Sequence, residues 1–209
     1  DKDGDLDIYL VNDEFINPVG NGLWRNDGPG CEGWCFTDVS QESGANTQVM
    51  GMGLATADYD NDGDQDFYFS NAGPMTLLQN QGDGTFSNQA ALAGVETPDS
   101  IGWGTLFFDY DNDGWQDLYL AVSEAASGEG SSSNPLFHNS KDGTFADVSS
   151  ISGVNDPGST LGASYADYDR DGRLDLLVGN TDSGYSLYRN QTAVGNWLAL
   201  DLVGGGPVN

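Results

Sequence analysis

The chain has 209 residues, enough for one β domain or a piece of a larger one, and it carries 33 acidic against 6 basic side chains for a formal net charge of −27. This charge argues against nucleic acid and anionic membranes as partners, because both repel an acidic surface. The chain contains no apolar run of membrane-spanning length, so we expect no membrane insertion.

An acidic loop that runs into a strand opens the chain. Asp1, Asp3, Asp5 and Asp7 alternate, and the strand formers Ile8-Tyr9-Leu10 follow them. The same arrangement returns in three complete nine-residue copies, at 58–66, 109–117 and 167–175. The copies start 51 and then 58 residues apart, and a period of this size predicts a chain of repeated supersecondary units.

Each unit repeats the same predicted elements around its loop. A Gly stands five residues before the loop, a first strand leads into it, and a second strand follows its last Asp. A third strand carries the pattern Leu-x-x-Asn, a tight turn such as Asp-Gly-Thr-Phe follows, and a fourth strand ends at a small residue plus Gly. The glycines before the loops are Gly53, Gly104 and Gly162, and the third strands end at Asn26, Asn80, Asn139 and Asn190.

Four short strands per unit, repeated at about fifty residues, predict an all-β β-propeller. About four four-stranded blades are visible, and we expect them to be part of a larger propeller. The units are A (1–50, partial, with a Cys-containing loop), B (51–101), C (102–160, with a Ser- and Gly-rich insertion) and D (161–192, incomplete). The sequence has no window with sustained helical periodicity, so we expect no helix.

Three features fall outside the repeat pattern. Cys31 and Cys35 form a pair that fits a short disulfide clasp in an oxidising compartment, with two free thiols as the alternative. Asn190 begins an Asn-Gln-Thr acceptor sequence for N-glycosylation. Residues 193–209 alternate like a strand and predict either a return strand or the start of a different module.

The nine-residue loops predict calcium sites. Carboxylates at positions 1, 3, 5 and 9 would repel one another around an empty centre, whereas calcium takes six to eight oxygens from carboxylates and a backbone carbonyl. A Gly at position 6 permits the bend, and position 7 would offer its carbonyl. The predicted ligands, about one ion per loop, come from Asp1, Asp3, Asp5, Asp7, Asp58, Asp60, Asp62, Asp64, Asp66, Asp109, Asp111, Asp113, Trp115, Asp117, Asp167, Asp169, Asp171, Arg173 and Asp175.

Two simpler explanations of these loops are weaker. Asp-Asn-Asp-Gly strings are common turn chemistry, but four copies in register, each ending in Asp before a strand, exceed what turns require. An EF-hand would need an acidic residue at position twelve and a helix on each side, whereas strand formers follow here.

The sequence offers little support for catalysis. His138 is the only histidine, and its slot in the repeat holds Arg25, Gln79 and Arg189 in the other units, which indicates a polar strand face rather than a general base. Trp103 and Trp115 are aromatic where their counterparts in unit B are not. They are candidates for a sugar-binding platform. Core or inter-blade packing is favoured for Trp103, and an exposed position beside the ion is favoured for Trp115.

The Asp-x-Asp-x-Asp-Gly-x-x-Asp loop, the later Asp-Gly-Thr-Phe and the closing Gly together resemble the FG-GAP/VCBS repeat of integrin α-subunit propellers and secreted bacterial proteins. The resemblance covers nearly the whole chain and implies a calcium-binding propeller, usually of seven blades, in an extracellular setting. The segment from Asn196-Trp197-Leu198 to Gly204 resembles the start of the ASPIC/UnbV module that follows such repeats.

These features predict a secreted or cell-surface protein that is stabilised by calcium and has no enzymatic activity. We expect it to act in adhesion, interaction or assembly, with a protein or glycan on a cell surface or matrix as its partner. One alternative is a carbohydrate-binding or polysaccharide-degrading propeller, and another is a subunit of an extracellular filament that assembles with itself through exposed strand edges.

Overall fold

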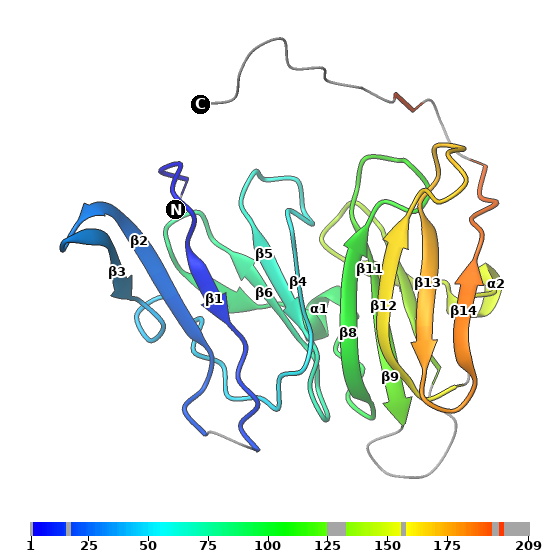
Figure 1. The fold of residues 1–209 in the computed structure, drawn as a ribbon, viewed down its shortest axis with the longest axis horizontal. Coiled ribbons are helices and arrows are strands. Elements are labelled where there is room, and N and C mark those ends of the chain that lie inside the picture. The colour runs from blue at the N-terminus through cyan, green and yellow to red at the C-terminus, as the bar shows by residue number, and fades with distance from the viewer. Residues whose placement is uncertain (1, 16–17, 125–132, 156–157, 194–196, 199–209) are drawn as a thin grey trace.

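A computed structural model gives the fold and describes residues 2–15, 18–124, 133–155, 158–193 and 197–198 (Figure 1). Four antiparallel sheets, one for each unit, lie side by side in chain order. Among the described residues the sheets form an open arc rather than a closed ring. The prediction of an all-β chain of propeller blades is confirmed.

The strands fall where the repeat pattern predicts them. Units A and D form three-stranded sheets and units B and C form four-stranded sheets. The strands are β1 (Ile8–Leu10), β2 (Gly22–Gly30) and β3 (Gly33–Asp38) in unit A; β4 (Leu54–Ala57), β5 (Asp66–Phe69), β6 (Thr76–Asn80) and β7 (Phe86–Asn88) in unit B; β8 (Ile101–Phe108), β9 (Asp117–Glu124), β10 (Leu136–Asn139) and β11 (Phe145–Asp147) in unit C; and β12 (Thr160–Ala166), β13 (Asp175–Asn180) and β14 (Gly184–Tyr188) in unit D. Strands β8 and β12 begin one residue before the predicted starts of their units.

The prediction that the chain has no helix is wrong in one respect. Two single-turn helices, α1 (Ala90–Ala93) and α2 (Ser149–Ser152), follow the fourth strands of units B and C. Each ends at a glycine in the left-handed conformation, Gly94 or Gly153, with φ of 80° and 77°. Four residues are too few to produce a helical period in the sequence, so only the closing Gly indicated where the chain turns.

The core lies between the sheets rather than inside any one of them. Because successive side chains of a strand point to opposite faces, units B and C bury both faces of their second strands. Tyr68 of β5 belongs to the cluster shared by units B and C, and Tyr119 of β9 to the cluster shared by units C and D. Both side chains have no exposed surface.

The glycines that precede the loops allow neighbouring sheets to meet along their first strands. A Cβ on Gly53 would lie 2.0 Å from the carbonyl oxygen of Trp103 on the next sheet, and one on Gly104 would lie 3.2 Å from the Cα of Gly162. Trp103 is thus part of the contact between units B and C: its carbonyl accepts a hydrogen bond from Ser70 Oγ at 2.7 Å. The indole of Trp103 is half-buried, and its Nε1 donates to Ser123 Oγ of β9 in its own sheet at 2.9 Å, so the packing of its ring between the units stays a prediction.

The features outside the repeat are described only in part. A disulfide joins Cys31 to Cys35 across the connection between β2 and β3. The described residues exclude most of the Ser- and Gly-rich insertion of unit C and most of 193–209. The predictions made for these two segments are therefore not tested. Among the helices that the structure describes, none is long and apolar enough to cross a membrane.

We predict that Gly53→Ala lowers the free energy of unfolding by about 2–3 kcal/mol, because the new methyl group must displace backbone of the next sheet. Urea denaturation followed by tryptophan fluorescence measures the change. Gly162→Ala is the matched control, since it occupies the same slot of the repeat and its Cβ would meet nothing within 4 Å. Equal destabilisation by the two changes would contradict the packing role of Gly53.

Candidate metal centre

The three complete loops join the first and second strands of their sheets and lie at the same end of the molecule, at the top of Figure 1. The partial loop of unit A leads into β1 in the same way. Asp1 lies outside the described residues, so this loop is described only from position 4 onward.

Backbone amides fold each loop around its first carboxylate. In unit C, Asp109 Oδ1 accepts the N–H of Asp113 at 2.9 Å and Oδ2 accepts that of Gly114 at 2.8 Å. The same pair of hydrogen bonds forms in the loops of units B and D. Position 4, such as Asn112 with φ 55°, and the Gly at position 6 adopt left-handed conformations. Asn and Gly tolerate these angles, which explains their place in the loop.

The carboxylate at position 9 of each complete loop is buried beneath that loop. Asp66, Asp117 and Asp175 are at most 1% exposed, and each accepts two backbone N–H groups. One comes from position 2 of the loop and the other from the Asn that ends the third strand. Burial raises the pKa of both Asp66 and Asp117 to about 7, because removal from water penalises the charged form more than these amides stabilise it.

Each complete loop gathers three carboxylates around one point. Carboxylate oxygens within 4.8 Å of one another come from three groups: Asp58, Asp60 and Asp62; Asp109, Asp111 and Asp117; and Asp167, Asp169 and Asp175. Oδ1 of Asp60 and Oδ1 of Asp111 are buried and have no hydrogen-bond partner. Both belong to position 3 of the loop. An unpartnered buried carboxylate oxygen is costly unless a ligand satisfies it, so the residues present fit a bound cation.

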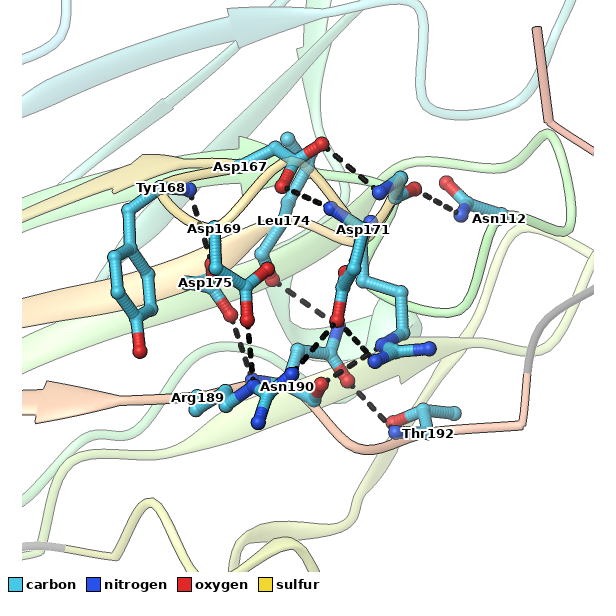
Figure 2. A network of polar contacts seen from close by, with 12 residues as sticks. Asn112, Asp167, Tyr168, Asp169, Asp171, Leu174, Asp175, Arg189, Asn190 and Thr192 are labelled. Carbon is cyan, nitrogen blue, oxygen red and sulfur yellow. Dashed lines mark hydrogen bonds and ion pairs between the residues drawn. The ribbon is translucent and has the colours of Figure 1, made fainter.

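The third residue of the third-strand Leu-x-x-Asn pattern differs between units, and so does its contact with the loop. Gln79 donates its amide to Asp60 in unit B. In unit C, His138 Nδ1 lies 3.1 Å from Asp117 Oδ1 and 3.7 Å from Asp111 Oδ2. In unit D the guanidinium of Arg189 lies 2.6 Å from Asp169 Oδ2 (Figure 2). His138 therefore faces the acidic loop, as the interchangeable polar residues of its slot indicated.

The Asn that ends each third strand carries a role that the sequence analysis did not assign. Asn139 is 1% exposed, and its Nδ2 donates to the carbonyl of Gln116 in its own loop and to that of Tyr59 in the loop of unit B, at 3.0 and 2.8 Å. Asn190 makes the matching pair with Leu174 and with Tyr110 of unit C. The recurrence of Asn at this position of every unit was the feature of the sequence that indicated such a role.

Neighbouring loops are also linked directly. Asn61 Nδ2 donates to the carbonyl of Gly114 at 3.3 Å, and Asn112 Nδ2 donates to that of Gly172 at 2.8 Å, as Figure 2 shows for the second bond. Lys2 of the partial loop lies 2.8 Å from Asp64 of the next loop. The loops thus form one hydrogen-bonded row along the end of the sheets.

The amide of Asn190 is engaged in the folded protein. Its Nδ2 donates to Tyr110 and Leu174, and its Oδ1 accepts the N–H of Thr192 at 2.9 Å (Figure 2). A glycan would have to replace a hydrogen on Nδ2 and break this arrangement. The N-glycosylation of Asn190 stays a prediction that the folded geometry opposes.

In the presence of a chelator, we predict that the protein becomes less stable as pH rises from about 4 to about 7. Over this window the folded state keeps protons on Asp66 and Asp117 that the unfolded chain has released, so the free energy of unfolding falls. Urea midpoints at acidic and mildly alkaline pH measure the effect. The double change Asp66→Asn and Asp117→Asn should reduce this slope, and an unchanged slope would contradict the assignment.

Comparison with known proteins agrees with the repeat pattern. A family model described as an FG-GAP-like repeat matches residues 1–69, 58–120 and 109–178, so that each match contains two consecutive loops.

Three relatives share part of this sequence. Cartilage acidic protein 1 of Mus musculus and of Homo sapiens are each 35% identical to it over 82 residues, which are 39% of this chain and 13% and 12% of those proteins. Cartilage acidic protein 1 of Xenopus tropicalis is 26% identical over 228 aligned residues, which cover 97% of this chain and 33% of that protein. The chain therefore spans no more than about a third of the length of these relatives.

Proposed function

The chain belongs to the FG-GAP-like repeat family, and we propose that it is an extracellular, calcium-stabilised set of propeller blades that acts as a non-enzymatic interaction module. The observation that carries the calcium proposal is the repeated convergence of three carboxylates per loop, with buried and unpartnered oxygens on Asp60 and Asp111.

Calcium suits this donor set because it is a hard cation that prefers carboxylate and carbonyl oxygens. Positions 1, 3, 5 and 9 of each loop would supply carboxylates, and position 7, such as Trp115, would supply its carbonyl. When bound, the ion would neutralise the carboxylates and remove the penalty of burying Asp117 in its charged form. The role is structural, since a cluster of three carboxylates recurs in the equivalent loops of units B, C and D.

An extracellular location agrees with three observations. The Cys31–Cys35 disulfide suits an oxidising compartment. Extracellular calcium is high enough to fill loops of modest affinity. The relatives carry the name cartilage acidic protein, and this chain shares their acidic character with its net charge of −27.

The positions of His138 and of the aromatic side chains favour an interaction role over catalysis. His138 Nδ1 contacts Asp117 and Asp111 within the loop, so it has a structural place rather than a position facing a cleft. The indole Nε1 of Trp103 is engaged by Ser123 Oγ at 2.9 Å, which weakens the sugar-platform alternative for this ring. Exposed aromatic rings do occur on β3, where Trp34 is 58% exposed beside the disulfide. Such rings are typical anchors for partners.

We predict that calcium raises the thermal midpoint by more than about 10 °C relative to excess EGTA. Calcium at one hundred times Kd adds about 2.7 kcal/mol per site, and three complete loops together add about 8 kcal/mol. Differential scanning fluorimetry in calcium, magnesium and EGTA measures the shift. Asp111→Asn should remove about a third of the calcium effect, whereas Asp99→Asn, a similar change outside the loops, should leave it intact. Identical midpoints in calcium and EGTA would refute the proposal.

The interaction role is tested by binding to immobilised extracellular matrix proteins and to a glycan array, in calcium and in EGTA. We expect saturable, calcium-dependent binding to a matrix protein and none to glycans. Binding to glycans alone would establish the carbohydrate-binding alternative. New reducing ends released from a bound polysaccharide would show an enzyme.

A further inference from the structure

Two hydrogen bonds in opposite directions join the loops of units C and D. Asn112, at position 4 of the loop of unit C, donates its Nδ2 to the carbonyl of Gly172 at position 6 of the next loop (Figure 2). Asn190, which follows the third strand of unit D, donates its Nδ2 to the carbonyl of Tyr110 at position 2 of the preceding loop, at 2.6 Å. Each of the two units therefore holds the loop backbone of the other.

The forward bond fixes a peptide group beside one expected calcium ligand. The carbonyl of Gly172 belongs to the peptide bond that leads to Arg173 at position 7, whose own carbonyl is an expected ligand. The N–H of the same peptide group, on Arg173, donates to Asp171 Oδ1 at 3.1 Å. Asn112 of unit C and a carboxylate of unit D thus set the orientation of this peptide group together.

The return bond fixes the backbone beside a second expected ligand. The carbonyl of Tyr110 belongs to the peptide bond that leads to Asp111, whose Oδ1 is buried and has no hydrogen-bond partner among the described residues. Asn190 is itself held by the loop of unit D, because its N–H donates to the buried Asp175 at 2.8 Å and its Nδ2 donates to the carbonyl of Leu174 at 3.1 Å. Order in the loop of unit D therefore holds the backbone next to Asp111 of unit C in place.

The junction of units B and C repeats both bonds. Asn61 donates to the carbonyl of Gly114, and Asn139 donates to that of Tyr59, the residue before Asp60. The Oδ1 of Asp60 is also buried without a hydrogen-bond partner in the part of the chain that the structure describes, so this return bond again ends beside a position-3 carboxylate that a cation would satisfy. The same pair of links at two junctions is a property of the repeat.

These links make the order of one loop depend on the order of the next. Without a cation, repulsion between neighbouring carboxylates opposes the closed form of each loop. A cation bound to one loop would order it together with the hydrogen-bonded backbone of its neighbour, so the neighbour would lose less conformational entropy when it binds its own cation. Because coupling between sites is reciprocal, each loop would raise the affinity of the other.

We propose that the loops of units B, C and D bind calcium cooperatively, and that Asn139 and Asn190 are positioning residues that carry the coupling together with Asn61 and Asn112. The inference rests on the proposed calcium sites and adds how their affinity is regulated. The linked loops fill over a narrower range of calcium concentration than independent sites would. Coupling of this kind typically changes affinity by about 5- to 150-fold.

The test measures the affinity of the loop of unit C with and without a working neighbour. Terbium, a luminescent substitute for calcium, is titrated into the calcium-free full chain and excited through Trp115, the only Trp within the three complete loops. Trp197→Phe is present throughout, because the ring of Trp197 lies beside Gly172 and would report on unit D. Asp169→Asn weakens the site of unit D. We expect this change to lower terbium affinity at unit C at least about fivefold.

Removal of the links separates coupling from a merely structural role. The combined change Asn112→Gly and Asn190→Ala removes both bonds, and Asp169→Asn should then change the affinity at unit C by less than about twofold. A merely structural role would lower the affinity by one factor whether or not unit D binds, so a fivefold effect that persists in this variant would overturn the proposal. Asn80→Ala is the matched control, since Asn80 holds the same repeat position and bonds Gln65 of its own loop but, among the described residues, no other loop. It should keep the fivefold effect.

If the combined change prevents folding, Asn112→Gly alone decides the question. Glycine keeps the left-handed conformation of Asn112, with φ 55°, and removes only the side chain that reaches Gly172. This variant should at least halve the effect of Asp169→Asn, and an undiminished effect would overturn the proposal.

The outcome also separates this inference from the proposed function. Terbium affinities at unit C that are equal with and without Asp169→Asn would overturn cooperative binding alone, since independent calcium sites would still stabilise the blades. Absence of any terbium signal that calcium displaces would overturn the proposed calcium sites, and the cooperative binding with them.

Discussion

The rest of the structure depends on the burial of one carboxylate beneath each of the three complete loops. Asp66, Asp117 and Asp175 have almost no exposed surface, and their oxygens hold the N–H groups of both the loop and the third strand. This contact fixes the loop to the sheet, but it leaves a charge away from water beside other carboxylates. The fold therefore combines a local order, imposed by hydrogen bonds, with an electrostatic conflict that a bound hard cation would resolve.

The same contact extends from unit to unit. Asn139 and Asn190 link the buried Asp of their own unit to a carbonyl of the preceding loop, while Asn61 and Asn112 reach forward to the next loop. A cation bound to one loop would thus also favour the arrangement of its neighbours. Along the first strands, close backbone approach at the glycines sets the spacing of the sheets. Stability is shared along the row, as in other repeat proteins.

The loops and a groove between units C and D give the molecule two distinct surfaces. The loops concentrate negative charge at one end of the sheets, where Gln79, His138 and Arg189 each contact a carboxylate of their own loop. The groove between units C and D is lined by apolar side chains such as Leu176 and by polar ones such as Arg189. The two surfaces therefore differ in the chemistry that they present.

The sequence alone determined the repeat, the strands and the loops, because each follows from short-range patterns: alternating carboxylates, turn glycines and β-branched or aromatic runs. It also showed that His138 occupies a repeat position that holds polar residues in every unit. Only the tertiary structure decided what depends on residues far apart in the chain. Asn139 bonds Tyr59, eighty positions away, Gly53 meets Trp103, and Tyr110 stays partly exposed where Tyr59 is covered. Such contacts arise from the stacking of one sheet on the next, and a pattern read within a single unit carries no information about that stacking.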